Sequence, residues 1–252
     1  MPALRFSANL SWLFPEIPDL PGRIEAAAGA GFRYVEVAWP YDSDPGEIRA
    51  ALRRHRVGLV LINTPPGDLQ AGELGLAAVP GRQDGFRDGL EKAVSWAKDL
   101  GCQRIHIMSG RVPLGAERQS VEREMEETLV ENLTYAAGVL SQAGLEGLIE
   151  PINTRITDPR YFLNTPHTSL IVTPRLSVRQ DLYHWQIMDG NLTQNMSSCF
   201  PLIGHVQIAQ VPHRNEPDSP GELNFMYLLH LLRELGYRGH VGCEYKPRGE
   251  QI

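Results

Sequence analysis

Four oxygen-bearing side chains recur at intervals of about one strand and one helix in the second half of the chain. They are Glu150, Asp181, Gln207 and Glu244, and each lies in a short apolar run typical of a buried strand. A charged group there is costly to desolvate unless an ion or another side chain pairs with it. Because all four offer only oxygen, they predict a divalent metal site that favours Mg²⁺ or Mn²⁺ over zinc. Taken singly, each residue also fits a structural role, such as an ion pair or a hydrogen bond to a backbone turn.

Two basic side chains near these positions are candidates for binding a substrate. His184 lies three residues after Asp181, and we expect it to hydrogen-bond a substrate oxygen unless it is a packed core histidine. Arg214 follows the seventh strand candidate, where it either binds a substrate carboxylate in bidentate fashion or is a solvated loop charge. His106 is expected to pack inside the fold. Glu36 is a lone strand carboxylate that either orients a loop or reaches the site.

Short β-rich runs alternate with helical periods along the chain, a pattern typical of βα units around a parallel sheet. We predict an α/β fold, a (β/α)8 TIM barrel formed by residues 1–252 as a single domain, because eight parallel strands close a barrel. An open doubly wound sheet is the competing interpretation, but the glycine-rich first turn that it often has is missing here. The strand candidates are Leu4–Leu10, Tyr34–Trp39, Gly58–Asn63, Arg104–Ser109, Gly147–Asn153, Ser177–Trp185, His205–Val211 and His240–Tyr245.

Alternation of side chains along these strands brings the polar candidates to one face. Glu244 shares a face with Gly242, while Cys243 faces the other way. Gln207 shares a face with His205. If these faces point into the barrel, the polar groups ring its interior at the carboxyl ends of the strands, where TIM-barrel active sites lie.

Glycines mark the ends of most helical periods, since glycine readily adopts the conformation that terminates a helix. The long segment Asp68–Gly85 is either a lid over the site or a surface excursion. The predicted helices are Leu20–Ala30, Pro45–Arg56, Phe86–Leu100, Ser120–Gln142 and Glu222–Leu235.

Two places depart from a regular barrel. Segment 167–179 contains proline and β-like residues where the fifth helix belongs, so we predict an atypical helix-five region. The chain also stops at Ile252, soon after the last strand, which leaves no sequence for an eighth helix. Both departures should lower the stability of the barrel.

Composition limits the classes of partner. The net charge is −6 and no Lys/Arg run occurs, which disfavours nucleic acid and anionic membranes. No apolar stretch is long enough to span a membrane. We expect a small-molecule substrate, with homo-oligomer formation left open. The cysteines at positions 102, 199 and 243 form no metal or redox pair, which favours a reducing compartment and a cytoplasmic location.

The chain resembles the hydroxypyruvate isomerase family, which belongs to the xylose-isomerase-like TIM barrels. The resemblance covers nearly the whole sequence and is carried by Ile149–Asn153, Asp181–Gln186, His205–Pro212, Gly242–Tyr245, Phe6–Phe14 and Val35–Tyr41. It implies interconversion of hydroxypyruvate and 2-hydroxy-3-oxopropanoate (tartronate semialdehyde), with Glu150 and Glu244 as the acid/base pair. It also implies that these two glutamates, Asp181 and Gln207 hold a divalent ion.

Such an aldose–ketose isomerisation passes through an enediolate. One group removes the proton next to the carbonyl, and a group returns a proton to the neighbouring carbon. Two alternatives remain open at this point. The chain is either an epimerase or isomerase of a longer ketose or 2-oxo acid sugar, or a catalytically impaired, truncated or variant product of the same family.

Overall fold

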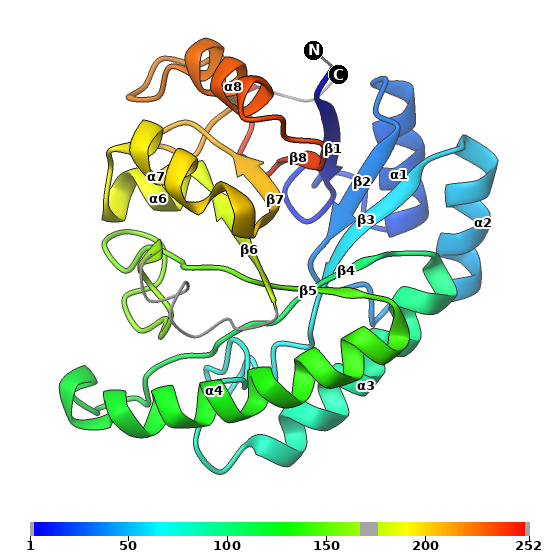
Figure 1. The fold of residues 1–252 in the computed structure, drawn as a ribbon. Helices are drawn as coiled ribbons and strands as arrows, with labels where there is room; N and C mark the ends of the chain where they lie inside the picture. Colours follow the sequence, from blue (N-terminus) through cyan, green and yellow to red (C-terminus); the bar gives the residue numbers. More distant parts are fainter. Residues whose placement is uncertain (1–2, 167–175, 250–252) are drawn as a thin grey trace.

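Eight parallel strands close into a barrel in the computed structural model, which describes residues 3–166 and 176–249. Each strand pairs with the next along the chain, and the last pairs with the first (Figure 1). The predicted (β/α)8 barrel is therefore confirmed. The strands are β1 Arg5–Asn9, β2 Tyr34–Val37, β3 Gly58–Asn63, β4 Arg104–His106, β5 Glu146–Ile149, β6 Ser177–Asp181, β7 Ile203–Ile208 and β8 His240–Cys243.

The barrel is closed at both places where the sequence departs from the regular pattern. Strand β5 pairs with β6 over a short register, with Leu148 opposite Ser177. Strand β8 pairs with β1, with Gly242 opposite Ser7. Because β8 pairs with β1, the sheet has no open edge, and the open-sheet interpretation is excluded.

Helices surround the barrel on its outside (Figure 1). The five predicted helices are present, and their ends differ from the predicted ones by three residues or fewer. Asp44 is the N-cap of the second helix, because its side chain accepts a hydrogen bond from the Glu47 amide at 2.9 Å. The helices are α1 Leu20–Gly29, α2 Pro45–His55, α3 Gln83–Leu100, α4 Arg118–Ala143, α6 Leu182–Met188, α7 Leu192–Cys199 and α8 Phe225–Glu234, with a 3₁₀ turn at Phe200–Leu202.

The prediction of a strand over Ser177–Trp185 is wrong in its second half. Strand β6 ends at Asp181, and α6 begins at the next residue. The Asp181 side chain accepts a hydrogen bond from the Tyr183 amide at 2.8 Å and so serves as the N-cap of α6. The cap outweighs the β-like composition of the residues that follow. Helix α7 was also not predicted.

The region predicted to be atypical, 167–179, falls largely outside the described residues, which resume at Leu176. Its last residues, from Ser177, belong to β6. The turns before it, at residues 153–158, are stabilised by Asn153, whose side-chain oxygen accepts hydrogen bonds from the Ile156 and Thr157 amides. After β8, residues 244–249 form no helix.

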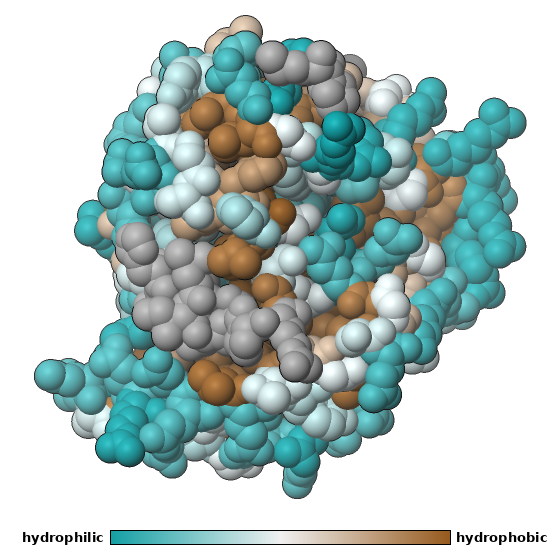
Figure 2. Space-filling view, viewed as in Figure 1, coloured by the Kyte–Doolittle hydropathy of each residue, from teal (hydrophilic) through white to brown (hydrophobic). Residues whose placement is uncertain are grey.

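The hydrophobic core lies between the strands and the helices that cover them. Helix α3 shows the arrangement, since Phe86, Leu90, Ala93 and Ala97 form one buried stripe at helical spacing. The opposite faces of such helices carry polar residues. On the face of the molecule seen in Figure 2, hydrophilic side chains lie at the periphery and hydrophobic ones lie nearer the middle. Among the described residues, no helix has the length and apolar character needed to cross a bilayer.

Segment Asp68–Gly85, the candidate lid, is attached to the residues that follow β4. The Ala77 and Ala78 amides donate to the carbonyls of Met108 and Ser109, at 3.3 and 2.7 Å, and both alanines are fully buried. The segment thus packs against the rim of the barrel along part of its length, and α3 begins within it.

A buried histidine gives the stability of the fold a dependence on pH. The His240 ring packs on Tyr34 with centroids 4.3 Å apart. Burial, together with nearby arginine charges, lowers the pKa of His240 to about 4. The unfolded chain therefore binds this proton more readily, and the folded state loses stability as the pH falls from about 6.5 towards 4.

We predict that His240→Phe will weaken this pH dependence, because the phenyl ring keeps the contact with Tyr34 but cannot be protonated. Urea unfolding at about pH 7 and about pH 5 should give a loss of stability smaller by roughly 1 kcal/mol in the variant than in the unaltered chain. His230→Phe, on the exposed side of α8, serves as the control and should not change the loss. An unchanged loss in His240→Phe would show that this ring is not responsible.

Candidate active site

The four predicted oxygen donors lie inside the barrel near the carboxyl ends of their strands. Glu150 directly follows β5, Asp181 ends β6, and Glu244 directly follows β8. Gln207 lies within β7, paired with Asp181 of β6 and Gly242 of β8. All four side chains belong to residues that are buried, with exposed fractions of at most 7%. The barrel thus brings together groups that are far apart in the sequence.

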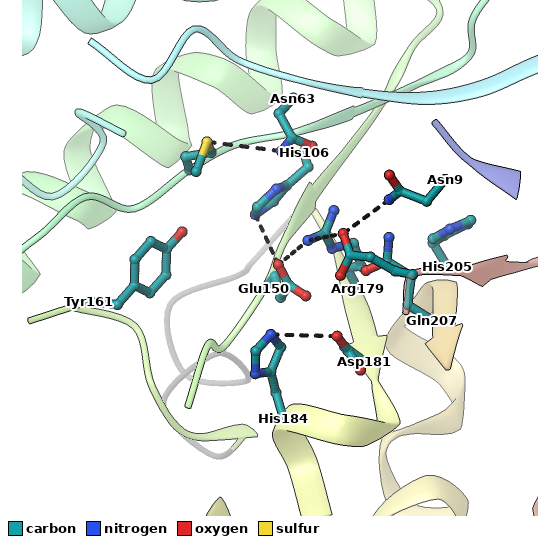
Figure 3. A network of polar contacts seen from close by, with 12 residues as sticks. Asn9, Asn63, His106, Glu150, Tyr161, Arg179, Asp181, His184, His205 and Gln207 are labelled. Atoms are coloured by element: carbon teal, nitrogen blue, oxygen red, sulfur yellow. Dashed lines mark hydrogen bonds and ion pairs between the residues drawn. The ribbon is translucent and has the colours of Figure 1, made fainter. Parts of the chain in front are cut away.

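An arginine that the sequence analysis did not single out lies between the two glutamates. Arg179 of β6 donates through Nη2 to Glu150 Oε2 (Figure 3). The same nitrogen lies 4.0 Å from Glu244 Oε1. One guanidinium nitrogen therefore lies against both carboxylates. Arg179 is two residues before Asp181, so the two side chains share a face of β6. That spacing is the signal through which the sequence could have revealed it.

Asp181 and His184 form a second group beside the first. His184 Nε2 lies 3.5 Å from Asp181 Oδ2 (Figure 3). Its Nδ1 lies 2.7 Å from the side-chain nitrogen of Asn153. Burial and the charges of two arginines hold the pKa of His184 well below its usual value, so the ring is neutral. One ligating atom each of Glu150, Asp181 and His184 fits within 4.8 Å of the others.

Arg214 is inside the site and not a solvated loop charge. Its Nη2 donates to Glu244 Oε2 at 2.5 Å and to Asp181 Oδ2 at 3.4 Å. The guanidinium carbon lies 4.3 Å from the ring centroid of Trp12 and 4.9 Å from that of Tyr183. Two aromatic rings thus fix the plane of a guanidinium whose partners are carboxylates.

His106 is buried, as predicted for interior packing, but it also borders the site. Its Nε2 lies 3.9 Å from Glu150 Oε2, and neither ring nitrogen has a hydrogen-bond partner among residues 3–166 and 176–249 (Figure 3). Burial and the charges of Arg179 and His205 keep its pKa well below the usual value. The ring is therefore neutral and offers the site one donor and one acceptor.

Gln207 differs from the other donors because it also contacts a deeper polar group. Its Nε2 donates to Glu36 Oε1 at 2.5 Å. Its Oε1 is buried and has no partner within the described part of the chain. Glu36, for which the sequence left two roles open, lies inside the barrel below the carboxylates.

Close packing of like charges shapes the electrostatics of the site. Burial raises the pKa of Glu150, the neighbouring charges of Glu244 and Asp181 raise it further, and Arg179 opposes them. Burial likewise raises the pKa of Asp181, against the lowering effect of Arg214. Three carboxylates face two guanidiniums, so the site favours additional positive charge or a shared proton.

The residues present suit a hard divalent cation. Glu150, Asp181 and His184 offer ligand atoms within 4.8 Å of one another, and Glu244 is not part of that group. Glu150 Oε1 and Gln207 Oε1 are buried without a partner among the described residues. Unpaired buried oxygens are costly unless something binds them. Oxygen donors of this kind are the ligands that Mg²⁺ and Mn²⁺ prefer.

Sequence comparison identifies the family of the chain. A family model described as "Xylose isomerase-like TIM barrel" matches residues 24–252. The chain belongs to this family. A curated relative from Xenopus laevis, named putative hydroxypyruvate isomerase, is 69% identical over 99% of this chain and 92% of its own length.

More distant relatives carry two different names. Hydroxypyruvate isomerase of Escherichia coli (strain K12) is 42% identical, over 97% of this chain and 94% of its own. The 2-oxo-tetronate isomerase of Haemophilus influenzae is also 42% identical, over 98% of this chain and 95% of its own.

A solved structure is also similar. The crystal structure from Brucella melitensis described as AP endonuclease, family 2, is 44% identical with a TM-score of 0.91, and the match covers 98% of this chain and 95% of that one.

We predict that Arg179→Met will destabilise the protein strongly. The variant removes the guanidinium group that lies between Glu150 and Glu244. Breaking a buried ion pair typically costs about 3–5 kcal/mol. Urea denaturation at about pH 7 measures the loss. Arg123→Met, which removes an exposed pair with Glu127 on α4, is the control and should have little effect. Similar losses in both variants would contradict the role assigned to Arg179.

Proposed function

We propose that this protein interconverts hydroxypyruvate and 2-hydroxy-3-oxopropanoate by proton transfer between adjacent carbons. The observation that carries the proposal is the pair Glu150 and Glu244, which approach one guanidinium nitrogen from two strands inside a buried site. Two carboxyl groups at one site can remove and return a proton on a small substrate. The names of the relatives, from vertebrate and bacterial sources, support the same reaction class.

The proposed reaction needs no outside oxidant. One glutamate removes a proton from C3 of hydroxypyruvate, and the electron pair of that C–H bond forms the C2–C3 double bond of an enediolate. The other carboxyl group delivers a proton to C2, and the proton of the C3 hydroxyl passes to the C2 oxygen, so that C3 becomes the aldehyde and C2 carries the hydroxyl. Burial raises the pKa of Glu150, which favours a carboxyl group that can hold the transferred proton.

Arg214 and His184 are proposed to bind the substrate. Arg214 would exchange its carboxylate partners for the carboxylate of the substrate, and the rings of Trp12 and Tyr183 would keep the guanidinium in plane for a bidentate contact. His184, neutral and next to Asp181, would donate or accept a hydrogen bond at a substrate oxygen.

A divalent cation is part of the proposal. Glu150, Asp181, Gln207 and Glu244 would hold it. Of these, Glu150 and Asp181 form with His184 a group whose ligand atoms lie within 4.8 Å of one another. A bound Mg²⁺ or Mn²⁺ would polarise the substrate carbonyl and stabilise the oxyanion that develops on it. With the cation neutralising the carboxylates, the guanidinium groups of Arg179 and Arg214 would be able to interact with the substrate.

A second candidate is isomerisation of a four-carbon 2-oxo-tetronate. The relative from Haemophilus influenzae with that name is as similar to this chain as the Escherichia coli hydroxypyruvate isomerase. Both substrates carry a carboxylate beside a ketone, which the same Arg214 contact would bind. The ratio of kcat/KM on the two acids decides between them, because a site fitted to three carbons disfavours the extra hydroxymethylene group.

We also propose a cytoplasmic location. The three cysteines, at positions 102, 199 and 243, are free and buried, and free thiols are typical of a reducing compartment.

We predict that Glu150→Gln and Glu244→Gln will each lower exchange of a carbon-bound proton with solvent by about 10²–10⁴-fold, at C3 of hydroxypyruvate for the glutamate that acts there and at C2 of 2-hydroxy-3-oxopropanoate for the other. The amide cannot act as a base, and this is the usual contribution of general acid–base catalysis. Incorporation of deuterium, followed by NMR, measures the exchange. Glu146→Gln is the control, since Glu146 begins β5 and pairs with Arg104 at the opposite end of the strand. Exchange at the unaltered rate in either site variant rules out that assignment.

Removal of the metal provides a separate test. We expect thorough EDTA treatment to abolish isomerisation and added Mn²⁺ to restore it. Mn²⁺ should also raise the melting temperature, because an ion that binds only the folded state stabilises it. In Asp181→Asn the rise should shrink, since the amide is a weaker ligand. Full activity in protein shown to be metal-free would remove the cation from the proposal.

A further inference from the structure

Glu36 of β2 is the centre of a second polar layer, beneath the carboxylates of the candidate site. It is 1% exposed. Its Oε2 lies 2.8 Å from the Ser7 hydroxyl and 2.9 Å from His205 Nε2. Its Oε1 accepts from Asn9 Nδ2 at 3.0 Å and from Gln207 Nε2 at 2.5 Å. Four side chains from β1 and β7 therefore converge on one buried carboxylate, which the proposed reaction does not use.

The carboxylate is charged in the folded protein. Ser7, Asn9, Gln207 and His205 direct polar hydrogens or a ring nitrogen at its two oxygens, which is the surrounding of an ionised carboxylate. An ionised carboxylate only accepts hydrogen bonds. Any amide that contacts it must therefore present nitrogen and turn its oxygen away.

This requirement reaches the active site through two amides. Asn9 Nδ2 lies 3.0 Å from Glu36 Oε1 and 3.0 Å from Glu244 Oε1, so a single amide nitrogen bridges the two carboxylates. Gln207 presents its nitrogen to Glu36, which leaves its Oε1 without a partner among the described residues. Without the charge of Glu36, both amides could turn over and exchange nitrogen for oxygen.

The neighbouring strand leaves room for this carboxylate. Gly242 of β8 pairs with Ser7 on one side and Gln207 on the other. A Cβ at Gly242 would lie within 2.4 Å of Glu36 Oε1, which is a severe overlap. A residue other than glycine would therefore displace the carboxylate from its four partners.

We infer that Glu36 is a positioning residue for the reaction: it fixes the Asn9 amide that holds Glu244, and it orients the Gln207 oxygen towards the site. Glu36 itself contacts none of the proposed acid, base or substrate-binding groups. The inference rests on the proposed function, because it assigns Glu36 a role in placing Glu244 and Gln207 for that chemistry.

The test is Glu36→Gln, which keeps the size of the side chain but removes its charge and adds a donor. Loss of an outer hydrogen bond to a ligand or catalytic group typically costs about 10–100-fold. We expect kcat on hydroxypyruvate to fall by about that factor with little change in KM, and the Mn²⁺ dissociation constant, measured by electron paramagnetic resonance, to rise similarly. Ser7→Ala is the matched control, since it removes one donor to the same carboxylate and should alter neither quantity. If Ser7→Ala reproduces both losses, the carboxylate has only a structural role.

Asn9→Ala tests the route to Glu244 and serves if Glu36→Gln does not fold. It should lower kcat and raise the Mn²⁺ dissociation constant by a smaller factor than Glu36→Gln does, because Glu244 loses its Asn9 contact while the Gln207 contact is intact. The double variant should lose less kcat than the product of the two single losses, as expected for residues that act in series. Unchanged kcat and unchanged Mn²⁺ binding in Glu36→Gln overturn the inference. Absence of hydroxypyruvate turnover in the unaltered protein overturns the proposed function instead, and Mn²⁺ binding still tests the Gln207 contact.

Discussion

Compensation of buried charge is the constraint on which the rest of the structure depends. Glu150, Asp181 and Glu244 are withdrawn from water inside the barrel, and two guanidiniums, Arg179 and Arg214, lie among them. Each carboxylate shares an arginine with a neighbour, so no pair is independent of the others. A desolvated charge is tolerated only while its partner stays in place. The barrel must therefore hold the ends of four strands at fixed separations. Closure of the barrel and the chemistry of the site both depend on these separations.

The interior is organised in two layers that differ in their tolerance of change. The upper layer has more acceptors than donors, with oxygens of Glu150 and Gln207 that have no partner within the described residues. That excess suits a layer that must accept a ligand. In the lower layer, both oxygens of Glu36 are engaged by donors from β1 and β7. Saturated hydrogen bonding makes the lower layer rigid, and a rigid base allows the upper layer to exchange partners without losing its geometry.

The barrel could be predicted well because its strands and helices are each marked by residues close together in the sequence. Apolar runs and glycine-terminated helical periods recur often enough to count strands and helices without knowing their contacts. The end of β6 was missed because one side-chain hydrogen bond, from the Tyr183 amide to Asp181, decides between strand and helix there. Composition averaged over a window does not register a single cap.

The site was predicted in part, for a related reason. Carboxylates in apolar strands are conspicuous, so Glu150, Asp181 and Glu244 could be selected from the sequence. Arg179 was not selected, since one arginine in a five-residue strand is equally typical of an exposed face. The partners of Glu36 lie on strands distant in sequence, and their convergence depends on the register of the closed barrel.

Asp181 joins the end of a strand, the start of a helix and the charge network in one side chain. Its Oδ1 holds the first turn of α6, while its Oδ2 faces Arg214 and His184. Tyr183 and His184 are carried by that same turn. A rotation of this carboxyl group towards a newcomer would release the turn and shift both side chains together. Binding of a ligand to the Asp181 carboxyl group would therefore be coupled to movement of Tyr183 and His184.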